Sequence, residues 1–225
     1  MMHQNHTHCG TQRGPETRGA TLHKASQYDF HTRLMGLGVN QANSRMIAQM
    51  ANIKVGDEVL DVGCGSGNLT LTAKRYAGQS GSVYGIDASP EMIDVARKKA
   101  QKMSTDVVFD VALIEKLPFG DSKFDVVINR LVLHHLPDDL KQQALAEIFR
   151  VLKPAGTIFL ADFQTPANPI LARLISLFIG HPAMMQSKVS NLIPMLAQAG
   201  FDNLTSGQTR SVFMGFARGN KLQDR

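Results

Sequence analysis

Cysteine and long apolar runs are both scarce in this chain, and each scarcity excludes a class of protein. The two cysteines, Cys9 and Cys64, lie in a polar segment and in a glycine-rich stretch, so a structural disulfide is not expected. The longest apolar stretch, residues 169–180, is interrupted by Arg173 and falls short of the roughly 20 residues that span a bilayer. No basic-then-apolar signal segment opens the sequence. We therefore expect a cytoplasmic protein with no transmembrane segment.

Charge of neither sign dominates the sequence. The formal net charge is +5, from 24 Lys and Arg against 19 Asp and Glu, which raises the question of a nucleic-acid partner. The basic residues are scattered, and the densest cluster, within residues 97–102, falls on an expected helix whose other face is apolar. We interpret this cluster as a solvated helix face, and a phosphate-binding patch is the alternative. No nucleic-acid partner is expected.

The length of 225 residues and the 43% hydrophobic content suit one domain with a sizeable core. Residues 1–24 are polar and lack an apolar period, so we expect a disordered tail. A single domain is expected over residues 25–217, followed by a short tail over residues 218–225. Within the domain, residues 25–51 have helical spacing broken by glycines and are expected to form a lid. No metal site is expected, although the first tail carries the metal-donor residue types His3, His6, His8 and Cys9.

Strand and helix signals alternate through the middle of the chain. Short apolar runs typical of strands fall at residues 57–62, 82–87, 106–112, 124–129 and 156–163. Helical spacing is found at residues 68–77, 90–102, 138–152 and 188–199. Strands that are separated by helix-length segments form parallel sheets with helices on both faces.

Two alternating runs near the end of the sequence, residues 201–206 and 211–217 with Gly207 between them, predict a β-hairpin at the far edge of the sheet. The expected fold class is therefore α/β, with a Rossmann-like, doubly wound sheet of seven strands. The sheet is expected to be mostly parallel, with a C-terminal antiparallel hairpin. The sequence leaves both a monomer and a homodimer open.

The chain is organised around residues 59–70. An apolar strand there ends at Val62, the sequence Gly-Cys-Gly-Ser-Gly follows at residues 63–67, and a helix begins at Asn68. Three glycines in five positions remove the β-carbons that would hold a flat ligand away from the main chain. This arrangement predicts a site for a ligand with a nucleoside at one end and a polar group at the other.

A carboxylate about twenty residues further along strengthens this interpretation. Asp87 ends the next strand, where its oxygens can accept both hydroxyls of a ribose; a helix-capping role is the alternative. Dinucleotides and S-adenosylmethionine (SAM) both bind to such an arrangement. The dinucleotide pattern requires a glycine at its sixth position, where this chain has Asn68, and its third glycine, Gly67, is at the fifth. The dinucleotide pattern therefore fails at its last position.

These residues, together with several further motifs, resemble the class I SAM-dependent methyltransferases over roughly residues 25–163. The motifs that carry the resemblance are residues 60–67, 85–87, 117–119, 124–125, 133–136 and 150–154. The chain is most similar to the branch of C-methyltransferases of ubiquinone and menaquinone biosynthesis, and this similarity extends to Tyr28 and Gly38. The resemblance implies a SAM cofactor, S-adenosylhomocysteine (SAH) as its product, and a small-molecule methyl acceptor.

The resemblance also implies a set of cofactor-binding residues. They are Tyr28, Asp61, Gly63, Cys64, Gly65, Gly67, Asp87, Ala88, Met92, Ile114, Glu115, Asn129 and Arg130. In this set Asp61 lies near the methionine ammonium, Asp87 takes the ribose, and Asn129 and Arg130 lie beside the methionine amine and sulfonium. Asn129 is also polar at the end of an otherwise apolar strand, which independently indicates a site at the carboxyl edge of the sheet.

The chain departs from this branch on the adenine side. Ala88 and Met92 keep the family's positions against the adenine, but the usual Asp-Ala pair before Leu-Pro-Phe is replaced by Leu-Ile-Glu at residues 113–115. Adenine is then expected to pack against Ile114, with Glu115 as a substitute acceptor. The quinone substrate of the branch is not carried over to this chain.

Two neighbouring histidines, His134 and His135, follow the fourth strand at the edge where an acceptor would approach. Methyl transfer requires the nucleophile, carbon and sulfur in line, and it requires a base only where the nucleophile must lose a proton. One of these histidines is a candidate general base; capping a turn or packing beneath the lid are the alternatives. Cys64, at a helix start, is a candidate for a lowered thiol pKa, although we prefer a role as a small residue beside the ligand.

The acceptor is indicated by composition alone. Residues 166–187 are rich in Leu, Ile, Phe and Met and poor in charge, so we expect them to cover an apolar or aromatic acceptor with a C, O or S nucleophile. A helix packed on the core is the alternative. An RNA or protein methyltransferase is an alternative. Of these, an RNA base methyltransferase is disfavoured, because residues 129–132 lack the Pro-Pro-aromatic clamp of enzymes that modify amino groups. A catalytically silent SAM- or SAH-binding module and an NAD-dependent oxidoreductase are the remaining alternatives.

Overall fold

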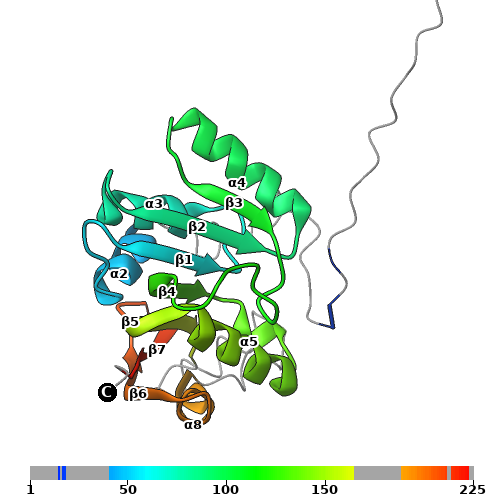
Figure 1. Cartoon of the computed structure of the whole chain (residues 1–225), viewed down its shortest axis with the longest axis vertical. Helices are drawn as coiled ribbons and strands as arrows, with labels where there is room; N and C mark the ends of the chain where they lie inside the picture. Colours follow the sequence, from blue (N-terminus) through cyan, green and yellow to red (C-terminus); the bar gives the residue numbers. More distant parts are fainter. Residues whose placement is uncertain (1–14, 16, 19–40, 165–188, 212–213, 223–225) are drawn as a thin grey trace, which may run out of the picture.

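The computed structural model describes residues 15, 17–18, 41–164, 189–211 and 214–222. These residues form one seven-stranded sheet with helices packed on both faces (Figure 1). The strands are β1 (Glu58–Val62), β2 (Ser82–Asp87), β3 (Val108–Val111), β4 (Phe124–Arg130), β5 (Leu152–Phe163), β6 (Phe201–Gln208) and β7 (Met214–Lys221). The α-helices are α2 (Gln41–Met50), α3 (Asn68–Ala77), α4 (Pro90–Lys102), α5 (Asp138–Val151) and α8 (Leu192–Gln198). Two short 3-10 helices are η1 (Leu133–His135) and η2 (Val189–Asn191).

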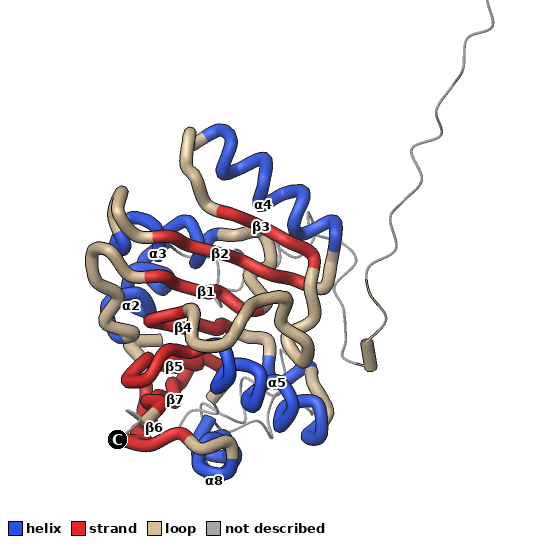
Figure 2. Tube along the Cα trace, in the orientation of Figure 1, coloured by secondary structure: helices blue, strands red, loops and turns tan. Residues whose placement is uncertain are grey.

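The strand order across the sheet is β3-β2-β1-β4-β5-β7-β6, and Figure 2 shows the strands as one continuous twisted layer. Neighbouring strands from β3 through β5 are parallel, whereas β7 pairs antiparallel with both β5 and β6. The predicted fold class is therefore confirmed. The strand order changes direction between β1 and β4, and open α/β sheets bind their ligands at the carboxyl ends of the strands at such a point.

Alternate residues of each strand pack into two separate clusters of buried side chains. Val59 and Phe159 belong to the cluster formed with α2, α3 and α4, whereas Leu60 and Ile158 belong to the cluster formed with α5 and α8. All four side chains are completely buried. Because both faces of the sheet are covered, its inner strands have near-continuous apolar sequences, as expected for parallel sheets.

The capped start of α4 explains why β2 ends at Asp87. The Ser89 side chain accepts a hydrogen bond from the backbone N–H of Met92 at 3.3 Å, and Pro90 occupies the first helical position. Glu91 adds a negative charge to the first turn, where the helix dipole favours it. The turn after Asp87 is thereby fixed, and this turn holds the carboxyl end of β2 in place.

The C-terminal hairpin is confirmed, but its bounds differ from the expectation. The strand β6 runs to Gln208, so Gly207 pairs with Phe216 inside the hairpin instead of forming its turn. The strand β7 runs to Lys221, and the prediction that a tail begins at residue 218 is wrong. The reason is that β7 lies between β5 and β6, so its polar last residues still have backbone partners on both sides.

The strand β5 also begins earlier than expected. The sequence predicts a helix through residue 152 and a strand from residue 156, but β5 already begins at Leu152, and its register with β4 shifts after Leu152 and resumes at Thr157. Ala155 has a φ angle of 65° within this irregular stretch. The helix expected over residues 188–199 is divided into η2 and α8. The helix α8 ends at Gln198, close to the expected end at residue 199, and Gly200 follows with a φ angle of 96°, as is common after a helix end.

Several expectations fall outside the described residues. These are most of the N-terminal tail, the first part of the lid before α2, and the whole acceptor cover over residues 166–187. No helix within the described residues is both long enough and apolar enough to cross a membrane.

Candidate functional site

The glycine-rich loop joins β1 to α3 at the carboxyl edge of the sheet. A β-carbon on Gly63 would lie 2.3 Å from Val132, and a β-carbon on Gly67 would lie 2.7 Å from Phe109. A β-carbon on Gly65 would meet nothing within 4 Å, although its φ angle of 52° is one that side chains rarely adopt. Packing inside the protein therefore requires glycine at Gly63 and Gly67, whereas Gly65 presents bare backbone to open space.

The carboxylate of Asp87 faces this loop from the end of β2. The backbone N–H of Gly65 donates to Oδ2 at 2.9 Å, and the backbone N–H of Ser89 donates to Oδ1 at 2.9 Å. Burial raises the pKa of Asp87 above its ordinary value, and these two hydrogen bonds oppose that shift. Ser89 caps α4, so Asp87 is not the capping residue. Each carboxylate oxygen keeps a further lone pair with which to accept from a ligand hydroxyl.

Asp61 supports the loop from below. Its side chain is only 1% exposed, and Thr70 Oγ1 donates to its Oδ2 at 2.7 Å, which ties β1 to the first turn of α3. Burial raises the pKa of Asp61 to about 6, while the Thr70 hydrogen bond and the charge of Arg130 oppose the shift. A cationic ligand group nearby would favour the ionised carboxylate.

Asn129, near the end of β4, carries an unpaired polar atom. The residue is completely buried, and its Nδ2 donates to the backbone carbonyl of Val62 at 2.6 Å, directly before the glycine loop. Its Oδ1 has no hydrogen-bond partner, and no other buried side-chain nitrogen or oxygen among the described residues is in that state. A buried acceptor without a donor costs roughly 1–3 kcal/mol. The position therefore suits a ligand that brings a donor.

Taken together, these groups fit the parts of a SAM molecule. The bare backbone at Gly65 allows close approach, Asp87 offers acceptors for two hydroxyls, and Asn129 offers an acceptor for an ammonium group. All three lie at the carboxyl ends of neighbouring strands.

The chain turns sharply as it leaves β4. Arg130 Nη1 donates to Oγ of Ser44, a buried residue of α2, at 3.0 Å. Leu131 has a φ angle of 60°, which is uncommon for a residue other than glycine, and its N–H donates to the carbonyl of Ala161 in β5. This turn carries Val132 against the glycine loop and places η1 beside the end of β5.

The helix η1 holds both predicted histidines. His134 Nδ1 lies 2.6 Å from Asp162 Oδ1, and the side chains of the two residues are only 8% and 3% exposed. The backbone N–H of His134 donates to Oδ2 of the same carboxylate at 3.2 Å. The ring of His135 lies against that of His134, with 3.9 Å between the ring centroids. Asp162 was not identified from the sequence. Its signal is a polar residue directly after the run 157–161, just as Asn129 follows the apolar residues of β4.

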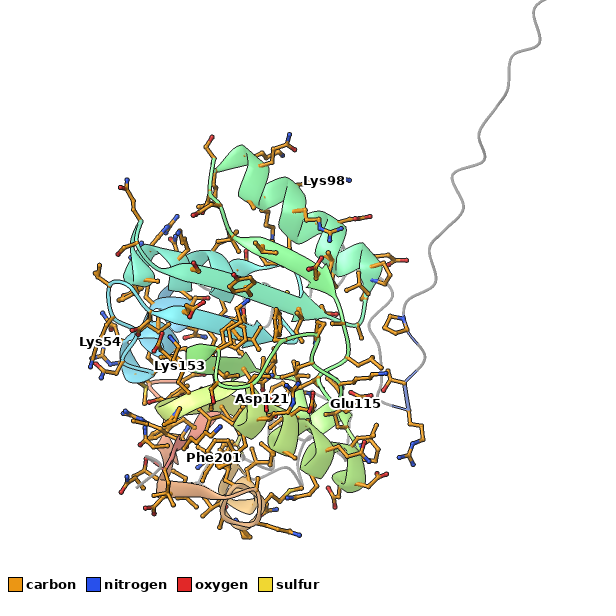
Figure 3. All side chains as sticks on the ribbon, viewed as in Figure 1. Lys54, Lys98, Glu115, Asp121, Lys153 and Phe201 are labelled. Carbon is orange, nitrogen blue, oxygen red and sulfur yellow. The ribbon has the colours of Figure 1, made fainter. Side chains whose placement is uncertain are left out.

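The residues predicted to contact the adenine differ in their surroundings. Met92 and Ile114 are almost fully buried, at 1% and 7% exposure, and Ala88 is half-buried. Glu115 lies at the edge of the molecule, as Figure 3 shows, and its Oε1 accepts a hydrogen bond from Thr17 Oγ1 at 2.7 Å. The expected substitute acceptor for adenine is thus already bonded to the N-terminal segment.

Cys64 does not have the lowered thiol pKa that its place at a helix start predicts. Burial raises the pKa of the Cys64 thiol well above its ordinary value, and the charges of Asp61 and Asp87 raise it further. Desolvation and two neighbouring carboxylates therefore outweigh the helix terminus. The direction of this shift favours the role of Cys64 as a small residue of the loop.

Tyr28 lies outside the described residues, so its predicted contact with the cofactor stays a prediction. In the described ranges, no group of three or more His, Cys, Asp and Glu side chains is arranged to hold a metal ion.

A family model described as a methyltransferase domain matches residues 53–210. The chain is 30% identical over 202 residues to a demethylmenaquinone methyltransferase of Lactobacillus johnsonii, which covers 80% of this chain and 82% of that protein. It is 29% identical to a ubiquinone/menaquinone biosynthesis C-methyltransferase of Pseudomonas paraeruginosa, over 96% of this chain and 94% of that protein.

Solved structures agree with the fold. A SAM-dependent methyltransferase from Aquifex aeolicus has a TM-score of 0.69 at 22% identity, over 88% of this chain and 97% of that one. A SAM-dependent methyltransferase from Methanosarcina mazei has a TM-score of 0.60 at 27% identity, over 78% of this chain and 98% of that one. With the family model, the relatives and the geometry of the glycine loop in agreement, the chain belongs to the SAM-dependent methyltransferases.

Proposed function

We propose that this enzyme transfers the methyl group of SAM to a small apolar or aromatic acceptor. The observation that carries this proposal is the hydrogen bond between Gly65 N–H and Asp87 Oδ2, because it joins the one open position of the glycine loop to a carboxylate. A loop and an acidic side chain held together in this way are preorganised for a nucleoside before any ligand binds.

The residues that would hold the cofactor divide by ligand group. Asp87 would accept the ribose hydroxyls, and Asn129 Oδ1 would accept from the methionine ammonium, whose charge Asp61 would balance. When bound, SAM supplies an electrophilic methyl group on a sulfonium and leaves as neutral SAH. The protein's own task is to hold the acceptor in line with that group and to exclude water.

Two observations support a small and largely apolar acceptor. Relatives that match most of the chain carry the names of quinone-pathway C-methyltransferases, and residues 166–187 have the apolar composition expected of a cover. The carboxyl edge beside β4 also carries aromatic and histidine rings, since Phe163 contacts the ring of His134 edge-on at 4.9 Å between centroids. Such rings pack well against a flat aromatic acceptor.

Two measurements test the proposal in sequence. Calorimetry with SAH measures cofactor binding, and Asp87→Ala should weaken it strongly. Labelled SAM offered with a panel of hydroquinones, phenols, thiols and amines then measures transfer. Label in an apolar aromatic member supports the proposal, whereas firm SAH binding without transfer to any member would favour the silent module. Absence of SAH binding would overturn the assignment of the cofactor site.

A further inference from the structure

The pair formed by His134 and Asp162 is the feature that SAM binding does not explain. Its two members are almost fully buried and come from different elements, η1 and β5, at 28 positions' separation in sequence. By contrast, Asp110 and Asp121 pair with arginines at positions where the carboxylate side chains are 59% and 75% exposed, and such ion pairs contribute little. Burying a histidine and a carboxylate carries a desolvation penalty that a surface pair avoids. Stability alone therefore does not explain this pair.

The hydrogen bonds of Asp162 determine which ring nitrogen of His134 carries the proton. The carboxylate accepts from the backbone N–H of His134 and from the backbone N–H of Phe163, both of which can only donate. An ionised carboxylate in this position also requires a donor at His134 Nδ1, 2.6 Å away. With the proton on Nδ1, the lone pair of the neutral ring is at Nε2.

The pair also lies close to the glycine loop. Val132, two residues before His134, is the side chain that a β-carbon on Gly63 would overlap. In the sheet, Arg130 pairs with Ala161, directly before Asp162, so the ends of β4 and β5 lie side by side, as in Figure 1. The histidine is therefore held on the methionine side of the predicted cofactor site, where the transferred methyl group would be.

We propose that His134 is the general base of the reaction, that Asp162 positions it, and that the acceptor is a hydroxylated aromatic ring, a phenol or hydroquinone. This inference rests on the proposed methyl transfer. In the step assigned to His134, the acceptor's O–H bond breaks and its electron pair stays on oxygen. The lone pair of Nε2 forms the new N–H bond, and the resulting imidazolium later returns the proton to solvent. The phenolate so formed carries nucleophilic density on its oxygen and on its ortho and para ring carbons.

A hydroxyl is favoured over the other acceptors because it is the one that gains most from a base. A phenol is largely protonated at neutral pH, since its pKa is about 10. A neutral arylamine attacks with a lone pair that it already has, and an aryl thiol ionises far more readily. General-base catalysis typically raises the rate by about 10²–10⁴-fold. This gain offsets the desolvation of a buried histidine and carboxylate only where the acceptor is protonated at neutral pH and must lose its proton.

The first experiment measures the tautomer of His134 without substrate or cofactor. Two-bond ¹H–¹⁵N spectra of the ¹⁵N-labelled full chain at neutral pH resolve the histidine rings, and His134→Gln identifies the signals of interest by their loss. We expect a proton on Nδ1 and none on Nε2. A ring protonated on Nε2, whether as the other tautomer or as imidazolium, would overturn the proposal. This measurement needs no variant of Asp162 that folds.

The second experiment compares matched acceptors with labelled SAM: 2-naphthol, 1,4-naphthohydroquinone, 2-naphthalenethiol and 2-naphthylamine. We expect label in the hydroxylated members, and we expect His134→Gln to lower kcat for them by about 10²-fold or more. Asp162→Asn should lower kcat with little change in KM, because it disturbs the tautomer and leaves the acceptor's surroundings in place. Asp110→Asn removes an exposed carboxylate of β3 and serves as the control.

The outcomes separate this inference from the proposed function. Transfer only to the thiol or the amine, or a larger loss in His135→Gln than in His134→Gln, would overturn the inference while leaving methyl transfer standing. A loss in Asp162→Asn confined to KM would likewise contradict a positioning role. No transfer to any member would contradict the proposed acceptor class. The measured tautomer of His134 would then be the remaining test of whether Asp162 positions that ring.

Discussion

The two sides of the site differ in how the chain assembles them. The cofactor side comes from the loop at residues 63–67 and from Asp87, which are separated by one helix and one strand. The proposed acceptor side comes from His134 and Asp162, which belong to η1 and β5. The first set forms a short motif in the sequence, and the second is brought together only by the pairing of β4 with β5.

This difference has a chemical meaning. A nucleoside needs bare backbone and one carboxylate, and a strand, a glycine turn and a helix supply these locally. The acceptor needs groups placed around a reacting atom, and such groups can come from any strand that ends at the same edge. The two sides meet where Val132 packs on Gly63. Substitutions can therefore affect both sides together or separate them.

The largest effect is expected where the two sides meet. Gly63→Ala places a β-carbon 2.3 Å from Val132 at a φ angle of 69°. Strained backbone and overpacking each cost roughly 1–3 kcal/mol, so the free energy of unfolding should fall by about 4 kcal/mol. Gly65→Ala meets open space and should lose only about 1 kcal/mol, while weakening SAH binding. Urea unfolding and calorimetry measure both; equal losses of stability would contradict the division between packing and ligand glycines.

A slightly smaller change in the free energy of unfolding is expected with pH. It arises from Asp61, which belongs to the cofactor side. Burial raises the pKa of Asp61 from 3.8 to about 6. Because the folded pKa is the higher one, Asp61 stabilises the fold most below pH 3.8, and this contribution is lost as pH rises through about 6. At about 1.4 kcal/mol per pKa unit, the loss is about 3 kcal/mol by pH 7.

Asp61→Asn isolates this contribution. An asparagine keeps an acceptor for Thr70 and carries no charge, so the variant should be about 3 kcal/mol more stable than the wild type at pH 7. The difference should shrink toward zero near pH 4, as measured by urea unfolding at a series of pH values. The same variant should bind SAH more weakly at pH 7. A difference that does not change with pH would contradict the raised pKa.

The next prediction separates the two sides directly. Asp87→Ala removes a charged acceptor from two ribose hydroxyls, and SAH affinity should fall by about 10²-fold or more, since such bonds contribute roughly 1.5–3 kcal/mol each. Asp162→Asn should change SAH affinity by about 2-fold or less while lowering kcat. Calorimetry on both variants, with Asp110→Asn as the control, tests the separation. An equal loss of SAH affinity in Asp162→Asn would mean that Asp162 also contributes to cofactor binding, and it would contradict the separation of the two sides.

Much of the fold could be predicted because its signals are local. The helices over residues 68–77 and 90–102 have the predicted bounds, since a glycine turn and a Ser-Pro-Glu cap determine where they begin. The end of β7 at Lys221 could not be predicted, because polar residues there stay paired only through neighbours on both sides. That information lies in the sheet order, which no short window contains.

The site follows the same rule. Asp87 was predictable from its distance to the glycine turn, and Asn129 from its place after an apolar run. Asp162 has the same kind of signal, but its meaning depends on His134, whose contact with it arises from the turn at Leu131. A polar residue at the end of a strand can thus be predicted to lie at the carboxyl edge of the sheet. The side chain with which it pairs is determined by the tertiary structure and cannot be predicted in this way.

The smallest effect is expected at Cys64, where local and tertiary influences oppose each other. A helix start favours a thiolate, but burial and the charges of Asp61 and Asp87 raise the thiol pKa. In a Cys9→Ser background, the remaining thiol should react with Ellman's reagent much more slowly in the folded protein than in urea. Cys64→Ala should cost about 1 kcal/mol of stability and leave SAH affinity within about 2-fold, because only a small apolar group is removed. Rapid reaction of the folded protein would mean that the helix terminus outweighs desolvation, and the cofactor side would then hold a reactive nucleophile beside its ligand.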